Sequence, residues 1–125
     1  MQRIAIIDGT RSPIAKGGGK LKQFQADILG AHIVRELTTR VDLPIELYDE
    51  VIMGNVSQPA HAANIARVIA LRAGFPESTI ASTVHRNCAS GMESITDATN
   101  KIRANDGEIF LAGGVESMSN IPQIG

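Results

Sequence analysis

The chain contains the stretch Ile109-Phe110-Leu111-Ala112-Gly113-Gly114, a short aliphatic run that ends in two glycines. Such a run is typical of a strand that is buried on both faces of a sheet. Three more aliphatic runs lie upstream, at residues 4–7, 51–54 and 80–85. The sequence therefore predicts four strands, and the run at 80–85 has the least regular pattern of the four.

Between consecutive runs, apolar residues recur at helical spacing. This spacing predicts amphipathic helices over residues 26–37, 65–71 and 92–102. The first must end before Pro44, and Gly74 lies where a left-handed C-terminal cap would close the second. The order β-α-β-α-β-α-β predicts an α/β fold, a layered parallel sheet with helices on both faces.

Length and composition indicate one globular domain over residues 1–125, with 43% apolar and 20% charged residues. A net charge of −1 gives no global field for nucleic acid or an anionic membrane. No apolar stretch is long enough to cross a bilayer. The single cysteine excludes an internal disulfide framework. We therefore expect a cytoplasmic protein that binds neither nucleic acid nor membrane.

That cysteine, Cys88, lies in the segment Asn87-Cys88-Ala89-Ser90-Gly91-Met92, between the third predicted strand and the third predicted helix. Unpaired N–H groups and the dipole at a helix N-terminus stabilise negative charge, and this placement lowers a thiol's pKa. The same N–H groups can hold the oxyanion that forms when a thiolate attacks a thioester. The alternative is that Cys88 is a small buried apolar residue, as most lone cysteines are.

The histidines near this segment do not complete a pair with the cysteine. His85 lies three residues before Cys88, and positions three apart on a strand point to opposite faces, which favours a structural or supporting role for His85. His32 and His61 have no cysteine or carboxylate at ligand spacing, so we expect no metal site.

Two other features of the sequence receive structural interpretations. Glu93 and Glu116 are the acids nearest to the candidate site in sequence, and we expect both to be hydrogen-bonded structural carboxylates. The stretch 17–20 lacks the glycine that a phosphate-binding loop needs five residues before its Gly-Lys pair, so we expect a flexible surface loop there.

Four segments in order carry a resemblance to the thiolase family: 7–13, 54–56 followed by 64–67, the nucleophile loop His85–Met92, and the Ala-Gly-Gly-Val-Glu-Ser-Met-Ser segment at 112–119. The resemblance implies acyl transfer between coenzyme A thioesters, by cleavage of a 3-ketoacyl-CoA or condensation of acetyl-CoA with an acyl-CoA, as in fatty acid metabolism. It implies that Cys88 is the catalytic nucleophile and forms an acyl-enzyme intermediate. It implies no bound cofactor, with coenzyme A thioesters as substrates, and a homodimer or homotetramer at full length.

The sequence departs from the thiolase pattern because two motifs of that family are absent from it. Thiolases take an activating histidine from a Gly-His-Pro motif and a second cysteine from a Cys-x-Gly motif, and neither motif occurs in this chain. The resemblance thus implies an incomplete N-terminal half, without its fifth strand, the loop domain and the C-terminal domain. We expect such a fragment to be inactive alone.

Two alternatives stay open at this point. A ketoacyl-synthase-like condensing enzyme also places a cysteine at a helix N-terminus, although the Asn-Cys-Ala-Ser-Gly-Met run favours a thiolase. The other alternative is a non-catalytic fragment for dimerisation or assembly, because thiolase subunits meet through their third strands near the nucleophile.

Overall fold

The computed structural model describes residues 2–121, so residue 1 and residues 122–125 of the expected domain lie outside the described part. Three strands form a parallel sheet: β1 (Glu50–Gly54), β2 (Ile80–Val84) and β3 (Phe110–Gly114). The order is β2-β1-β3, and Gly54 at the end of β1 is level with Val84 and Gly114. The predicted strands at 51–54, 80–85 and 109–112 are therefore confirmed to within one or two residues.

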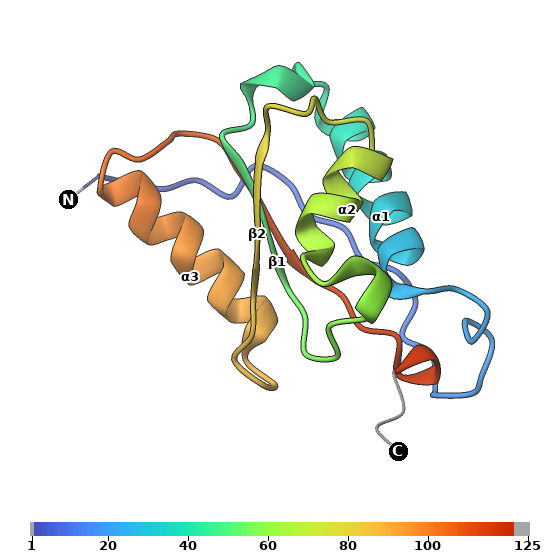
Figure 1. Cartoon of the computed structure of the whole chain (residues 1–125). Helices are drawn as coiled ribbons and strands as arrows, with labels where there is room; N and C mark the ends of the chain where they lie inside the picture. The colour runs from blue at the N-terminus through green and yellow to red at the C-terminus, as the bar shows by residue number, and fades with distance from the viewer. Residues whose placement is uncertain (1, 122–125) are drawn as a thin grey trace.

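Three helices cover the sheet, α1 (Ala26–Val41), α2 (Ile65–Arg72) and α3 (Ser90–Arg103). Figure 1 shows α1 and α2 on one face and α3 alone on the other, which confirms the predicted α/β layering. Short 3-10 turns occur at Ile45–Leu47, Ala60–Ala62 and Met118–Asn120. None of the helices in the described part of the chain is long and apolar enough to span a bilayer.

The main core lies between the sheet and the α1–α2 layer. Val51 and Met53 point into it and pack with Ile65 and Ile69 of α2, which are fully buried. Because side chains alternate along a strand, Ile52 faces the other way, toward α3, and it is fully buried as well. Burial on both faces explains why β1 reads as an unbroken aliphatic run.

The predicted end of the second helix is confirmed. Gly74 has a φ of 95°, and the Phe75 N–H donates to the Ala70 carbonyl at 2.9 Å, which closes α2 with a left-handed cap.

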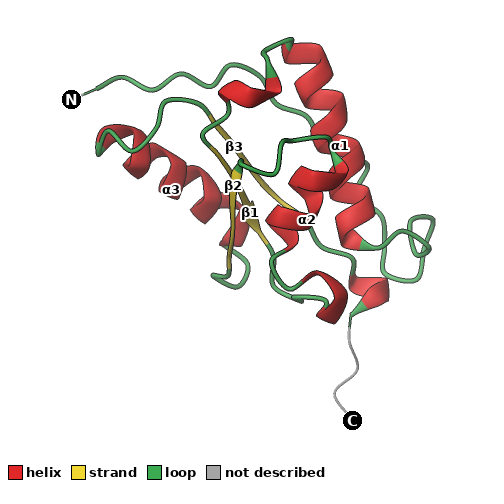
Figure 2. Cartoon of the chain, turned by 45° about the horizontal axis from the view of Figure 1, so that its top comes forward, coloured by secondary structure: helices red, strands yellow, loops and turns green. Residues whose placement is uncertain are grey.

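The prediction of a strand at residues 4–7 is wrong for this structure. The segment is drawn as loop in Figure 2, and Ile6 and Ile7 are 85% and 69% exposed. A strand needs a neighbour for its backbone groups, and this run finds none among the described residues. The segment is held instead by Asp8, whose carboxylate accepts from Arg40 at the end of α1 at 3.0 Å. The hydrogen bond from Arg40, with the Gly9 N–H, lowers the pKa of Asp8.

The glycine-rich stretch at 17–20 forms turns on the surface, as predicted, and is tied to the far end of the chain. The Gly18 N–H donates to Ser119 Oγ at 2.7 Å, and Ser117 Oγ donates to the Phe24 carbonyl at 3.0 Å. These bonds join two segments that are about a hundred residues apart in sequence.

Candidate functional site

Cys88 lies in a tight turn between the end of β2 and the start of α3, two residues before the helix begins. Its side chain is exposed and free, so the interpretation of Cys88 as a buried apolar residue does not hold. Asn87, just before it, has a left-handed φ of 49°. Asparagine tolerates this conformation better than most residues, and it lets the chain reverse sharply from strand to helix.

The backbone of the turn leaves several N–H groups free at the helix start. The Ala89 N–H donates to the Arg86 carbonyl at 3.0 Å, and the Ser90 N–H donates to the Asn87 carbonyl at 3.1 Å. By contrast, the N–H groups of Cys88, Gly91 and Met92 have no acceptor among residues 2–121. Free N–H groups at a helix N-terminus favour a negative charge beside them, which suits a thiolate or an oxyanion.

Glycines at the ends of two strands bring α3 close to the sheet. A Cβ atom on Gly54 would overlap the Ser90 carbonyl group and lie 2.6 Å from the Gly91 nitrogen. A Cβ atom on Gly114 would lie 3.1 Å from the Gly91 Cα. The backbone of the first turn of α3, next to the cysteine turn, therefore packs directly against the backbone at the carboxyl ends of β1 and β3, with no side chain between them.

Glu93 forms an ion pair across the turn. Its carboxylate accepts from Arg86 Nη1 at 2.8 Å, and this bond raises the pKa of the Arg86 guanidinium. The pair links Arg86, two residues after the end of β2, to the first turn of α3, and Cys88 lies between the two residues in sequence. Glu93 is thus hydrogen-bonded, as expected, and this contact agrees with the structural role predicted for it.

Glu116 joins the carboxyl ends of β1 and β3. Its Oε1 accepts from the Val56 N–H at 2.7 Å, and its Oε2 accepts from the Ser57 N–H at 3.1 Å and from Asn55 Nδ2 at 3.3 Å. Asn55 is fully buried and also donates to the Val115 carbonyl at 2.9 Å. These contacts agree with the structural role predicted for Glu116, whereas Asn55 was not singled out from the sequence.

No histidine in the described part of the chain forms a hydrogen bond with the Cys88 side chain. His85 is exposed, and its Nδ1 accepts from the Asn87 N–H at 3.3 Å. His61 lies instead beside Asp27 of α1, with Nε2 3.1 Å from Oδ1, and Arg72 Nε approaches Oδ2 of the same carboxylate at 3.0 Å. This cluster could not be predicted from the sequence, because Asp27 is 34 or more residues away from both of its partners.

The pKa of Asp27 reflects opposing causes. Burial raises the pKa of this carboxyl. The hydrogen bonds from His61 and from its own backbone N–H lower the pKa, and so do the charges of His61 and Arg72. Together these lowering effects outweigh burial, so the pKa is below its ordinary value.

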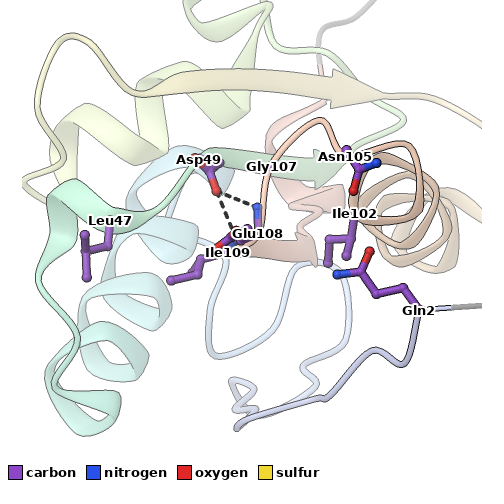
Figure 3. Close-up of a pocket in the computed structure, with 8 residues that line it drawn as sticks. All are labelled: Gln2, Leu47, Asp49, Ile102, Asn105, Gly107, Glu108 and Ile109. Carbon is purple, nitrogen blue, oxygen red and sulfur yellow. Dashed lines mark hydrogen bonds between the residues drawn. The ribbon is translucent and has the colours of Figure 1, made fainter.

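Two cavities lie away from the cysteine. Figure 3 shows the larger, of about 440 Å³, where the Asp49 carboxylate accepts from the N–H groups of Glu108 and Ile109 at 2.7 and 3.0 Å. It lies at the amino ends of the strands, the opposite end from Cys88. The other, of about 340 Å³, is mainly apolar and lies between α1 and β3 under residues 10–14. Cys88 lines neither cavity. Among residues 2–121, no three His, Cys, Asp or Glu side chains gather as metal ligands.

This strand–turn–cysteine–helix arrangement has relatives among known proteins. Residues 4–124 match the family described as "Thiolase, N-terminal domain". The chain belongs to the thiolase family.

Named thiolases resemble the chain over nearly its whole length. It is 42% identical to the 3-oxoadipyl-CoA/3-oxo-5,6-dehydrosuberyl-CoA thiolase of Escherichia coli K12 over 124 residues, which cover 98% of the chain and 31% of that protein. A probable acetyl-CoA acyltransferase of Staphylococcus epidermidis is 39% identical, with 99% and 32% covered. The crystal structure of the Bacillus anthracis acetyl-CoA acetyltransferase superposes with a TM-score of 0.85 at 40% identity, covering 89% of the chain and 28% of that structure. The chain thus spans about a third of the length of these relatives.

Proposed function

We propose that the chain carries the nucleophile of an acyl transfer between coenzyme A thioesters, and that Cys88 is the residue that accepts the acyl group. The observation that carries this proposal is the exposed Cys88 thiol, next to free N–H groups at the start of α3. The names of its relatives, thiolase and acetyl-CoA acyltransferase, support the reaction class. Coenzyme A thioesters are then substrates, and the reaction needs no resident cofactor.

The proposed first half-reaction follows from the chemistry of the thiol. The Cys88 thiolate attacks the thioester carbonyl carbon, so that an Sγ–carbon bond forms and the carbonyl oxygen becomes an oxyanion. Collapse of this intermediate breaks the carbon–sulfur bond to coenzyme A. The leaving coenzyme A thiolate then takes up a proton from solvent, which balances the proton lost by Cys88. Nearby N–H groups stabilise the oxyanion.

The second half-reaction needs groups that this site does not contain. Condensation requires a base that removes an α-proton, cleavage requires an acid that supplies one, and no second thiol exists in the chain. Within residues 2–121 no histidine contacts the Cys88 thiol by a hydrogen bond. We therefore assign only acylation of Cys88 to this partial N-terminal domain, and we expect full turnover only together with a loop domain and a C-terminal domain. We place this chemistry in the cytoplasm, where a free thiol stays reduced.

Intact-mass measurement after brief exposure to acetyl-CoA tests the proposal, with Cys88→Ser as the control. We expect one acetyl group on the wild-type chain, removable by hydroxylamine, and none on Cys88→Ser. An adduct that persists in Cys88→Ser would come from another nucleophile and would contradict the assignment. The absence of any adduct, with a thiol that still reacts with iodoacetamide, would show that Cys88 is accessible but not an acyl acceptor here.

The open edge of the sheet supports a second candidate, a dimerisation or assembly role. β2 is an edge strand, and Ile80 at its start is 63% exposed. Unpaired edge strands with apolar side chains favour pairing with another chain. A homodimer that forms through β2 while the thiol reacts at an ordinary rate would favour this role over acylation. Light scattering together with the acetyl-CoA assay distinguishes the two.

A further inference from the structure

The hydroxyl of Ser90 lies at the centre of the cysteine turn. Ser90 is the first residue of α3 and is only 4% exposed. Its Oγ accepts from the Arg86 N–H at 2.7 Å and donates to the Asn87 carbonyl oxygen at 2.7 Å. The Ser90 N–H donates to the same oxygen at 3.1 Å. The Asn87 carbonyl therefore has two donors, both from Ser90.

That carbonyl shares a peptide group with the Cys88 N–H. The peptide group is planar, and none of the described peptide bonds is cis, so the N–H points away from the C=O. Holding the Asn87 oxygen toward Ser90 fixes the direction of the Cys88 N–H on the opposite side. This N–H has no acceptor in the described part of the chain and lies on the residue that bears the thiol.

The turn needs this support because its backbone is strained. Asn87 adopts a φ of 49°, which for a residue other than glycine carries a conformational cost. The Ser90 hydroxyl binds the backbone on both sides of Asn87, at the Arg86 N–H and at the Asn87 carbonyl. Without the hydroxyl, the Arg86 N–H loses its acceptor and the Asn87 oxygen keeps only the Ser90 N–H as a donor, so the orientation of the peptide plane is held less firmly.

We propose that Ser90 is a positioning residue that orients the Cys88 N–H as an oxyanion donor by holding the Asn87–Cys88 peptide plane. This inference deepens the proposed function and rests on Cys88 being the nucleophile. In this proposed role, Ser90 contacts neither the substrate nor the thiol. It acts through the backbone, so its loss affects reactions that develop an oxyanion and spares those that do not.

Two reagents separate these classes of reaction. With p-nitrophenyl acetate, the thiolate forms an Sγ–carbon bond at the carbonyl, an oxyanion develops, and the bond to nitrophenolate breaks. With iodoacetamide, an Sγ–carbon bond forms as the carbon–iodine bond breaks, and no oxyanion develops. Both rates rise with the fraction of thiolate and with access to the sulfur, but only acylation develops an oxyanion. A change in the oxyanion donor therefore changes the ratio of the acylation rate to the alkylation rate.

The experiment compares Ser90→Ala, Ser90→Thr and Ser94→Ala with the wild-type chain. Ser94 is a matched control, because it is fully buried one turn further along α3 and donates to the Gly91 carbonyl at 2.6 Å. Since removal of one oxyanion donor slows acyl transfer by about a hundredfold or more, we expect misorientation in Ser90→Ala to lower the ratio by roughly tenfold. Ser90→Thr keeps the hydroxyl and restores the ratio, and Ser94→Ala leaves it unchanged.

Equal loss of acylation and alkylation in Ser90→Ala, or loss of neither, would overturn the proposal. Circular dichroism checks that each variant folds. If Ser90→Ala does not fold, amide hydrogen exchange in the wild-type chain decides the matter. The Arg86 N–H is expected to be protected through its bond to Ser90 Oγ, and exchange as fast as in an unfolded peptide would contradict the proposal.

The outcome is independent of coenzyme A recognition. A lowered ratio in Ser90→Ala with no acetyl adduct from acetyl-CoA would support the role of Ser90 and count against thioester acylation by this chain. An acetyl adduct together with an unchanged ratio would support thioester acylation by this chain and count against the role of Ser90.

Discussion

Gly54 packs so closely against Ser90 that a Cβ atom at residue 54 would overlap the Ser90 carbonyl group. This contact joins the end of β1 to the first residue of α3, and it sets the height of the cysteine turn above the sheet. Backbone cannot yield in the way that the end of a flexible side chain can. The absence of a side chain at residue 54 is therefore part of how Cys88 is placed.

Gly54→Ala is expected to destabilise the fold by about 1–3 kcal/mol, as overpacking of a close contact does. It should also change the rate at which Cys88 reacts with iodoacetamide, because α3 must move away from the sheet. Urea unfolding and alkylation kinetics measure the two effects. Gly9→Ala is the matched control, since a Cβ atom there meets nothing within 4 Å. Equal stability of the two variants would mean that the contact does not set the helix position.

Glu116→Gln is expected to lower stability by roughly 1–3 kcal/mol, because hydrogen bonds from backbone N–H groups to a charged carboxylate are lost or weakened. The carboxylate accepts from two backbone N–H groups, at Val56 and Ser57, through different oxygens. A glutamine offers one acceptor oxygen and turns its NH₂ group toward the other N–H. Urea unfolding measures the loss.

The same variant separates a structural role for Glu116 from an acid–base role. The acylation-to-alkylation ratio at Cys88 should be unchanged in Glu116→Gln. A stable variant in which this ratio falls would point to a direct role in the chemistry.

Asp27→Asn should destabilise the chain by about 1–3 kcal/mol near neutral pH, because it removes the charge between His61 and Arg72. The pKa of Asp27 is lowered in the folded state, below the ordinary 3.8. Its contribution to stability is therefore present above that value and is lost as the pH falls through the folded pKa.

Urea unfolding at several pH values checks this dependence. The difference between wild type and Asp27→Asn should shrink as the solution becomes acidic. Asp106→Asn, at an exposed carboxyl, is the control and should leave the free energy of unfolding close to that of the wild-type chain. A penalty for Asp27→Asn that stays constant into acid would mean that the buried carboxylate does not act through its charge.

The elements that formed as predicted are those whose signal is local. α1, α2 and α3 follow the apolar spacing of their own residues, and β1 and β3 follow aliphatic runs that end in glycine. The run at 4–7 has the same local signal and yet forms no strand, because pairing depends on a neighbour. Periodicity describes which side chains can be buried and does not describe which backbone lies beside them.

The candidate site likewise has one part that local sequence signals predict and another part that depends on long-range packing. That Cys88 precedes a helix could be predicted from the run of residues 87–92, and Asn87 carries a local signal for a left-handed turn. The support around the turn could not be predicted. Gly54 reaches Ser90 only because β1 and α3 pack in layers, and Glu116 meets residues about 60 positions away. Such contacts are properties of the packed fold.

The contribution of Asp97 on α3 to folding stability is expected to depend on pH in the opposite direction from that of Asp27. Burial raises the pKa of Asp97, and the neighbouring Glu93, by its charge and a hydrogen bond, raises it further, against a weaker lowering by Lys101. A folded pKa above the ordinary 3.8 means that the protonated carboxyl favours the fold. That contribution is complete below the unfolded value and is lost as the pH rises through the folded pKa.

Asp97→Asn keeps a hydrogen-bonding side chain without the charge. It is expected to stabilise the chain near neutral pH by a few tenths to about 1 kcal/mol, the scale of partly exposed charge interactions, and to have little effect in acid. Urea unfolding of Asp97→Asn beside Asp27→Asn should give differences from wild type of opposite sign near neutral pH, both fading in acid. Destabilisation by Asp97→Asn near neutral pH would show instead that the charged carboxylate is held mainly by Lys101, in the manner of Glu50, whose Oε1 lies 2.5 Å from the same ammonium group.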